Sequence, residues 1–315
     1  LGTCRYPGIG MDRLRADAAL GQILQLFADG PGDVQGRTSD LNTPGRALPG
    51  AEGDLLATAP TAGLHRPPAM MLMLGDQIYA DATAGLLDPA TPTERFTERY
   101  DYAFGLGNSP KMARLLRTLP VLMTPDDHEF RNGWPHEGPI MATGDEAKAQ
   151  STAQAMLHAY QSLTNPLGKP GSYMVDIGPC RFCVLDTRSA RQLDDDDLLP
   201  AQVMRDLAGW ISSAGERFVC VCTGTVLLPR LYEDTCPANP VAVNDGFERA
   251  EPQRQAILDM CVEHAAGRFA LISGDYHVAS AVQIHRAGQA QPVGCAIVAP
   301  PLYAPFRYIN TLAHE

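Results

Sequence analysis

The sequence predicts an α/β protein in which stacked β-sheets are covered by outer helices. Three observations support this prediction. Short apolar runs alternate with segments of helical periodicity, each apolar run ends in small or polar residues, and neither an internal repeat nor a change of composition divides the chain. The 315 residues are about twice the ~150 of a usual domain, but single α/β domains reach this length. We therefore expect one domain over residues 1–315, with a long loop insertion at about 30–68 that is rich in Gly, Pro, Thr and Asp.

Five apolar runs predict buried strands. Each run is continuous rather than alternating, which is typical of a strand that is covered on both faces. The runs are MMLMLGD at 70–76, VLMTPDDHE at 121–129, RFCVLDTR at 181–188, FVCVCTGT at 218–225 and FALISGDYH at 269–277. Further strands are expected around Val282 and Ile284 and at 295–299.

Four segments carry apolar residues at helical spacing, and they lie between or beside the predicted strands. These segments are 12–28, 145–162, 200–213 and 251–266. Pro200 and Pro252 stand near the first turn of the last two, where the fixed φ of proline suits the start of a helix. We expect these helices to form the outer layers.

Composition excludes several classes of protein. Lys and Arg number 25 against 36 Asp and Glu, which gives a net charge of -11. A protein that binds duplex nucleic acid needs a basic surface, so this partner is not expected. A small anionic substrate stays compatible with the charge, because a bound cation reverses the local field. No apolar run reaches the ~18 residues that a membrane-spanning helix needs, so no membrane span is expected.

Cysteine usage and the start of the chain bear on its compartment. Eight cysteines in 315 residues are too few for a disulfide scaffold, and most lie in apolar stretches such as RFCVLD, where cysteine packs as a small hydrophobe. The chain opens at Leu1 without a signal-peptide pattern, so we expect any export signal to have been removed. The compartment stays open, although the cysteines favour a reducing one such as the cytoplasm.

Chemically active side chains stand at the ends of the predicted strands. In open α/β sheets, ligands bind outside the carboxyl ends of the strands, so these residues should meet in one region. Clustered carboxylates repel one another unless a cation lies among them, and a pair of metal ions resolves this repulsion. Mixed oxygen, nitrogen and sulfur donors suit transition metals better than magnesium. The residues concerned are Cys4, Asp76, Asp126, Asp127, His128, Glu129, Asp186, Arg188, Asp275 and His277.

The ordered motifs resemble those of a known family. GDQIYAD (75–81), PDDHEFRNGW (125–134), LDTR (185–188) and SGDYH (273–277) resemble the PhoD-like phosphatases of the calcineurin-like metallophosphoesterase superfamily. The opening TCRYPG resembles the cysteine-bearing first strand of that family, and the resemblance extends to PPLYAPF at 300–306. It implies an α/β fold of four αββα layers, with two facing mixed sheets flanked by helices. Members of this family are often exported.

The resemblance also implies a set of metal ligands. Asp76 would bridge two metal ions, Cys4 would bind iron, and Asp127 would bind the second metal. Asp275 and His277 would complete the site. The family also uses a tyrosine as a ferric ligand, for which Tyr100 is the best match and Tyr102 the alternative. The implied cofactors are two divalent or trivalent metal ions, namely Fe(III) together with Ca, Mn or Zn.

Three further residues are implied to act on the substrate. His128 would stabilise or protonate the leaving oxygen, and Asn132 and Arg188 would bind the phosphate, with Arg188 also counted as catalytic. Purely structural roles stay open for several of these residues. Cys4 could be a buried core residue, Tyr100 a helix-packing residue, and Arg188 a partner in a structural salt bridge.

The function implied by the resemblance is metal-dependent phosphoric ester hydrolysis. The protein would be an alkaline phosphatase D-like phosphomonoesterase or phosphodiesterase, in which a metal-bound hydroxide attacks a small phosphate ester at a dinuclear site. The alternatives are another metallohydrolase, such as a phosphotriesterase or lactonase, and a non-catalytic binding protein on the same fold. The oligomeric state and the choice between monoester and diester stay open.

Overall fold

The structure is a computed structural model that describes residues 1–6, 16–28, 68–81, 91–105, 107–135, 140, 145–163, 165–191, 197–228 and 246–304. The predicted loop insertion at about 30–68 lies outside these residues, apart from residue 68. The prediction of a single domain over residues 1–315 stays a prediction. Within the described ranges, every helix is too short or too polar to cross a bilayer.

The larger sheet has six strands in the order β4-β5-β6-β7-β9-β8. Its centre is parallel from β5 to β9, and β4 and β8 run antiparallel at the two edges. The strands are β4 (Tyr173–Ile177), β5 (Cys180–Leu185), β6 (Phe218–Thr223), β7 (Phe269–Ser273), β8 (Ser280–His285) and β9 (Pro292–Val298). The strands predicted at 181–188, 218–225 and 269–277 and in the tail are therefore confirmed.

The second sheet combines two short parallel pairs. β1 (Thr3–Arg5) pairs with β10 (Pro301–Tyr303), and β2 (Met71–Leu74) pairs with β3 (Val121–Thr124). A parallel bridge between Gly2 and Met73 joins the pairs, so the order is β10-β1-β2-β3. Within the described residues this sheet is wholly parallel rather than mixed, because helices carry the chain from β2 back to the start of β3.

The helices occupy two groups. Those predicted at 145–162, 200–213 and 251–266 are confirmed, and the one predicted at 12–28 is described from residue 16. Two helices between β2 and β3 were not among the predicted segments. The helices are α2 (Ala18–Ala28), α3 (Pro92–Phe104), α4 (Pro110–Thr118), α5 (Glu146–Leu157), α6 (Ala201–Ser212) and α8 (Glu251–Ala265). A π-helical turn, His158–Ser162, continues α5.

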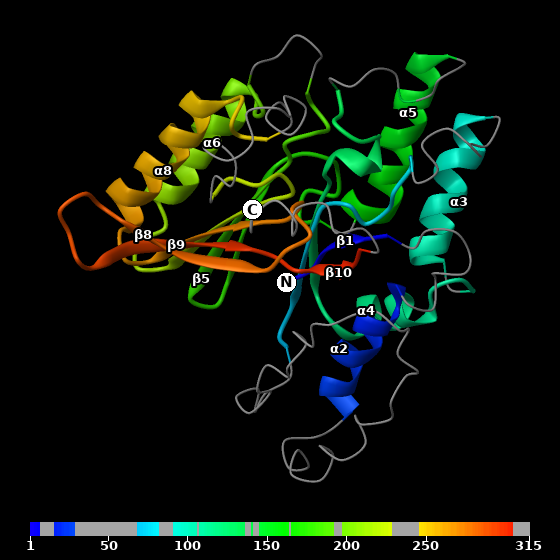
Figure 1. Ribbon diagram of the computed structural model, residues 1–315, viewed down its shortest axis with the longest axis horizontal. Coiled ribbons are helices and arrows are strands. Elements are labelled where there is room, and N and C mark those ends of the chain that lie inside the picture. The colour runs from blue at the N-terminus through cyan, green and yellow to red at the C-terminus, as the bar shows by residue number, and fades with distance from the viewer. Residues whose placement is uncertain are drawn as a thin grey trace, which may run out of the picture.

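Three separate hydrophobic cores show that the molecule has four layers. In β2, Met71 and Met73 pack against the group α2 to α5, whereas Leu72 and Leu74 face the large sheet. Residues of β6 and β7 divide in the same way between the inter-sheet core and the core under α6 and α8. Alternate side chains of a strand point to opposite faces, so both sheets are covered twice. Figure 1 shows α6 and α8 over the large sheet and α2 to α5 on the other side, which confirms the αββα sandwich.

The carboxyl ends of the strands approach one another closely. Gly75 follows β2 with φ +80°, and a Cβ there would lie 2.5 Å from Cβ of Asp126, which follows β3. Gly274 follows β7, and a Cβ there would lie 2.0 Å from the carbonyl oxygen of Leu74. Only glycine fits at these two points. The two sheets are thereby brought together at the edge where the motif residues stand.

Candidate metal centre

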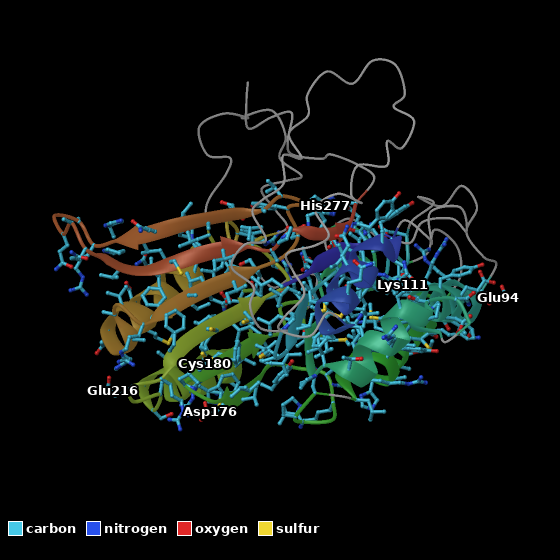
Figure 2. All side chains as sticks on the ribbon, turned by 90° about the horizontal axis from the view of Figure 1, so that it is seen from below. Glu94, Lys111, Asp176, Cys180, Glu216 and His277 are labelled. Carbon is cyan, nitrogen blue, oxygen red and sulfur yellow. The ribbon has the colours of Figure 1, made fainter. Side chains whose placement is uncertain are left out.

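Two groups of metal-ligating side chains meet at one carboxylate. The first group is Cys4, Asp76 and His277, and the second is Asp76, Asp127 and His128. Within each group the ligand atoms lie within 4.8 Å of one another. Figure 2 labels His277, which lies between the strands of the large sheet and the blue N-terminal part of the chain. Asp76 belongs to both groups, so the two groups adjoin at its carboxylate.

The backbone is strained at this site. Among the described residues, four that are not glycine have positive φ: Cys4 at 47°, Asp76 at 55°, Asp275 at 69° and His277 at 51°. Each such residue costs about 1–3 kcal/mol, and such strain is concentrated at functional sites. All four residues belong to the motifs that the sequence analysis singled out. The strain therefore marks this strand edge as a site whose geometry matters more than its local stability.

Cys4 is fully buried among oxygen atoms. Its Sγ lies 3.5 Å from Oδ2 of Asp76 and 3.5 Å from the backbone carbonyl oxygen of Asp275. The hydroxyl of Thr3 is 3.1 Å away. Burial, and then the negative charge of Asp76, raise the pKa of the thiol well above its ordinary value. A cation would favour the thiolate instead, because metal binding and deprotonation of a cysteine are coupled.

Among the described residues, no group donates a hydrogen bond to one of the two carboxylate oxygens of Asp76. Its Oδ2 accepts hydrogen bonds from the Tyr79 hydroxyl at 3.1 Å and from the Cys4 thiol, whereas its Oδ1 is buried without a hydrogen-bond partner. Burial raises the pKa of Asp76 well above its ordinary value, the charge of His128 opposes this, and Asp127 adds to it. A buried, unpartnered carboxylate oxygen is costly unless something positive binds it. The residues present therefore fit a bound cation.

Tyr79 is a site residue that the sequence analysis missed. Its hydroxyl lies 3.1 Å from Oδ2 of Asp76 and 2.9 Å from Nε2 of His277. Its ring packs between those of His128, at 4.2 Å, and Tyr6, at 4.9 Å. Burial, and then Asp76, raise the pKa of this phenol well above its ordinary value. The signal was present, because Tyr79 stands three residues after Asp76 inside the quoted motif GDQIYAD.

Tyr100 makes its contacts within a helical core. Tyr100 is fully buried in α3, where its ring stacks on those of Tyr160 and Phe104. Its hydroxyl accepts a hydrogen bond from Nε2 of Gln161 at 3.4 Å. Tyr102 lies two residues further along the same helix, about 200° around its axis. These contacts match the helix-packing alternative for Tyr100, and the tyrosine at the ligand cluster is Tyr79.

His128 forms a hydrogen-bonded pair with Asp81. Its Nδ1 lies 2.7 Å from Oδ1 of Asp81, whose Oδ2 accepts the backbone N–H of Asn132 at 2.7 Å. Burial lowers the pKa of His128, but Asp81, then Asp127 and Asp76, raise it well above its ordinary value overall. Burial acts to raise the pKa of Asp81, yet His128 and the hydrogen bonds lower it to about 2. With Nδ1 engaged, Nε2 is the ring nitrogen left for a substrate or a metal.

Asn132 and Arg188 have different surroundings. Asn132 is exposed, and its backbone N–H donates to Asp81, the partner of His128. Arg188 is fully buried, and its Nε donates to Oδ1 of Asp126 at 2.6 Å while Nη1 donates to the carbonyl of Trp134 at 2.8 Å. Both partners of this ion pair have no exposed side-chain surface. The buried ion pair with Asp126 matches the structural salt-bridge alternative for Arg188, and the predicted catalytic and phosphate-binding role of Arg188 stays a prediction.

Asp127 and Asp275 are held by the backbone around them. Oδ2 of Asp127 accepts the N–H of Gly133 at 2.6 Å, which fixes the carboxylate in the second ligand group. Asp275 places its carbonyl oxygen against Cys4, and its N–H is 3.4 Å from the hydroxyl of Thr3. Its carboxylate belongs to neither ligand group. The role of Asp275 as a metal ligand stays a prediction.

A family model and solved structures match this chain. The family model of the PhoD-like phosphatases matches residues 58–313. A structure of PhoD aligns with a TM-score of 0.57 and 16% identity, over 74% of this chain and 51% of that chain. The purple acid phosphatase PPD1 from yellow lupin (Lupinus luteus) seeds aligns with a TM-score of 0.43 and 14% identity, over 75% and 38% of the two chains.

The other comparisons limit what can be carried over. A search of curated proteins found no match. This chain spans about half the length of the PhoD chain, and the likeness to it shows the fold. The family model, in contrast, covers most of the sequence and contains all the motifs that follow β2, β3, β5 and β7. The chain belongs to the PhoD-like phosphatase family.

Proposed function

We propose that this protein is a metal-dependent phosphoric ester hydrolase that works with two cations sharing Asp76. The observation that carries the proposal is the pair of ligand groups with Asp76 in common, one of whose oxygens is buried and unpartnered. Membership in the PhoD-like phosphatase family supports it. When bound, two such cations polarise a phosphoryl group and activate water near neutral pH.

The donor chemistry differs between the two halves of the site. Cys4, Tyr79 and His277 offer sulfur, phenolic oxygen and nitrogen, a set that suits Fe(III). Tyr79 replaces Tyr100 as the proposed ferric ligand. Asp127 offers a carboxylate, which suits Ca, Mn or Zn at the second position. The carboxylate of Asp275 is the further ligand that we propose to complete the site.

His128 would act on the leaving group. In the protonated state that Asp81 favours, its Nε2 can donate a proton to the departing oxygen of a phosphate ester. Exposed Asn132 stands beside this pair and would contact the substrate at the rim. The remaining residues hold this arrangement in place, and Arg188 does so by fixing the loop of Asp126.

The proposed substrate is a small phosphate ester, either a monoester or a diester. Protein stripped with a chelator and reloaded with Mn²⁺ should hydrolyse p-nitrophenyl phosphate or bis(p-nitrophenyl) phosphate, and the chelated protein should not. The ratio of the two rates separates phosphomonoesterase from phosphodiesterase. Hydrolysis of a phosphotriester or a lactone alone would favour another metallohydrolase. Two tightly bound metals without any hydrolysis would identify a binding protein and contradict the proposal.

A further inference from the structure

Glu129 is a buried carboxylate to which neither the ligand groups nor the leaving-group step assigns a role. It has no exposed surface. Its Oε2 accepts the backbone N–H groups of Asp76 at 3.1 Å and Asp126 at 3.0 Å. Its Oε1 accepts the backbone N–H of Gln77 at 2.7 Å and the side-chain Nε2 of Gln161 at 2.9 Å. Four N–H donors therefore converge on one carboxylate.

Three of these donors come from the two loops that carry the proposed metal ligands. Asp76 and Gln77 follow β2, whereas Asp126 follows β3 and immediately precedes Asp127. The two loops are about 50 residues apart in sequence but leave neighbouring parallel strands. Glu129 therefore links the loop of Asp76 to the loop that carries Asp127 by hydrogen bonds.

These hydrogen bonds from Glu129 also fix the strained backbone at Asp76. Asp76 has φ 55°, and both its own N–H and that of Gln77 are fixed by Glu129. A residue in this conformation persists only when its surroundings over-determine it. The two hydrogen bonds supply that constraint at the residue whose two oxygens must face two cations.

We propose that Glu129 is a positioning residue for the metal centre, which sets the distance and orientation between Asp76 and Asp127. This inference rests on the proposed function, because it takes both aspartates as metal ligands. Glu129 accepts hydrogen bonds from the backbone N–H groups of Asp76 and Asp126, so it acts on these residues through their backbone. Mutation of a residue that holds metal ligands in position, without binding the metal itself, typically lowers metal affinity by roughly 10–100-fold.

The position requires a carboxylate rather than an amide. An ionised carboxylate only accepts hydrogen bonds, at about four sites, and here four donors face it. A glutamine at position 129 would turn its NH₂ group either toward the N–H of Gln77 or toward the N–H groups of Asp76 and Asp126. At least one of these donors would then lose its acceptor. Gln161, the fourth donor, belongs to the π-helical turn after α5, a widened helical turn of a kind often found at functional sites.

The test is the affinity of the metal-free protein for Mn²⁺ alone, measured by titration calorimetry, together with the melting temperature without metal. Glu129→Gln should weaken Mn²⁺ binding roughly 10–100-fold. Gln253→Leu is the matched control, because Gln253 is buried and bonds the N–H groups of Leu198 and Leu199 away from the site. It should lower the melting temperature at least as much and leave the Mn²⁺ affinity unchanged.

A second variant keeps the test decisive if Glu129→Gln does not fold. Gln161→Leu removes one donor and leaves Glu129 in place, so Mn²⁺ affinity should fall by roughly 2–10-fold, the effect of one hydrogen bond. Wild-type affinity in the folded variants, with only the melting temperature lowered, would overturn the inference and leave the proposed function standing. If the wild type binds two Mn²⁺ ions but hydrolyses no ester, the proposed function is wrong. The Mn²⁺ affinities of Glu129→Gln and Gln161→Leu would still decide the inference about Glu129. A wild-type protein that binds no Mn²⁺ would overturn both.

Discussion

Tyr79 and Tyr100 differ in what their hydroxyl groups contact, although both are buried and both follow the first aspartate motif. The hydroxyl of Tyr79 meets Asp76 and His277, whereas that of Tyr100 meets the amide of Gln161. A phenol beside a carboxylate, an imidazole and a thiol has the surroundings of a metal ligand. A phenol whose ring stacks against two other aromatic rings has the surroundings of a core residue.

The first prediction separates these two tyrosines. A phenolate bound to Fe(III) absorbs visible light by charge transfer from ligand to metal. Protein loaded with Fe(III) should therefore be coloured, and Tyr79→Phe should bleach or shift the band. Tyr100→Phe, the matched control, should leave the spectrum unchanged and lower only stability. A spectrum that changes with Tyr100 and not with Tyr79 would reverse the assignment.

The second prediction concerns the His128–Asp81 pair. His128→Ala should reduce kcat by roughly 10²–10⁴-fold, the range for lost proton transfer, with metal content nearly unchanged.

A general acid works only while protonated, so activity falls as pH rises through its pKa. Asp81 raises the pKa of His128, hence Asp81→Asn should lower that pKa and move the alkaline limb of the kcat profile to lower pH. Asp176→Asn, at the surface pair with Arg181, should not move it. A loss of one metal in His128→Ala would make His128 a ligand instead.

At the scale of elements, continuous apolar runs predicted β2, β3, β5, β6 and β7, and helical spacing predicted α5, α6 and α8. The signal for α3 was local and was not used: Thr91 caps the helix by accepting the N–H of Glu94, and Pro92 opens it. The very short strands β1 and β10 gain their order from pairing with each other, across almost the whole chain. Such long-range pairing leaves no periodicity that a single sequence could reveal.

The third prediction tests the close approach of the strand ends. Gly75→Ala would place a Cβ 2.5 Å from Cβ of Asp126 and force alanine to φ +80°. It should destabilise the metal-free protein by roughly 1–3 kcal/mol in urea unfolding and weaken Mn²⁺ binding. Gly209→Ala is the control, because a Cβ in that helix meets nothing within 4 Å and should stabilise by about 1 kcal/mol. Equal effects of the two changes would mean that the β2–β3 junction tolerates a side chain.

At the scale of the whole molecule, the fold brings five distant segments to one edge of two facing sheets. The sequence analysis predicted that edge, and the candidate ligands Asp76, Asp127 and His277 that it placed after apolar runs lie together there. It left open whether Arg188 binds the phosphate or forms a structural salt bridge, and the buried ion pair with Asp126 is visible only in the assembled structure. Nor could it predict the positive φ values of Cys4, Asp76, Asp275 and His277, which the assembled site imposes on ordinary residues.

The central claim is that one carboxylate, Asp76, is shared by two cations. The most direct measurement is the number of metals per chain in protein reloaded with Mn²⁺, dialysed and analysed for metal content. The wild type should hold two, Asp127→Asn and His277→Ala should each lose one, and Asp76→Asn should lose both while its circular dichroism spectrum stays native. Retention of one full metal equivalent by Asp76→Asn would contradict the claim, because the loss of a ligand that both cations share should weaken the binding of both.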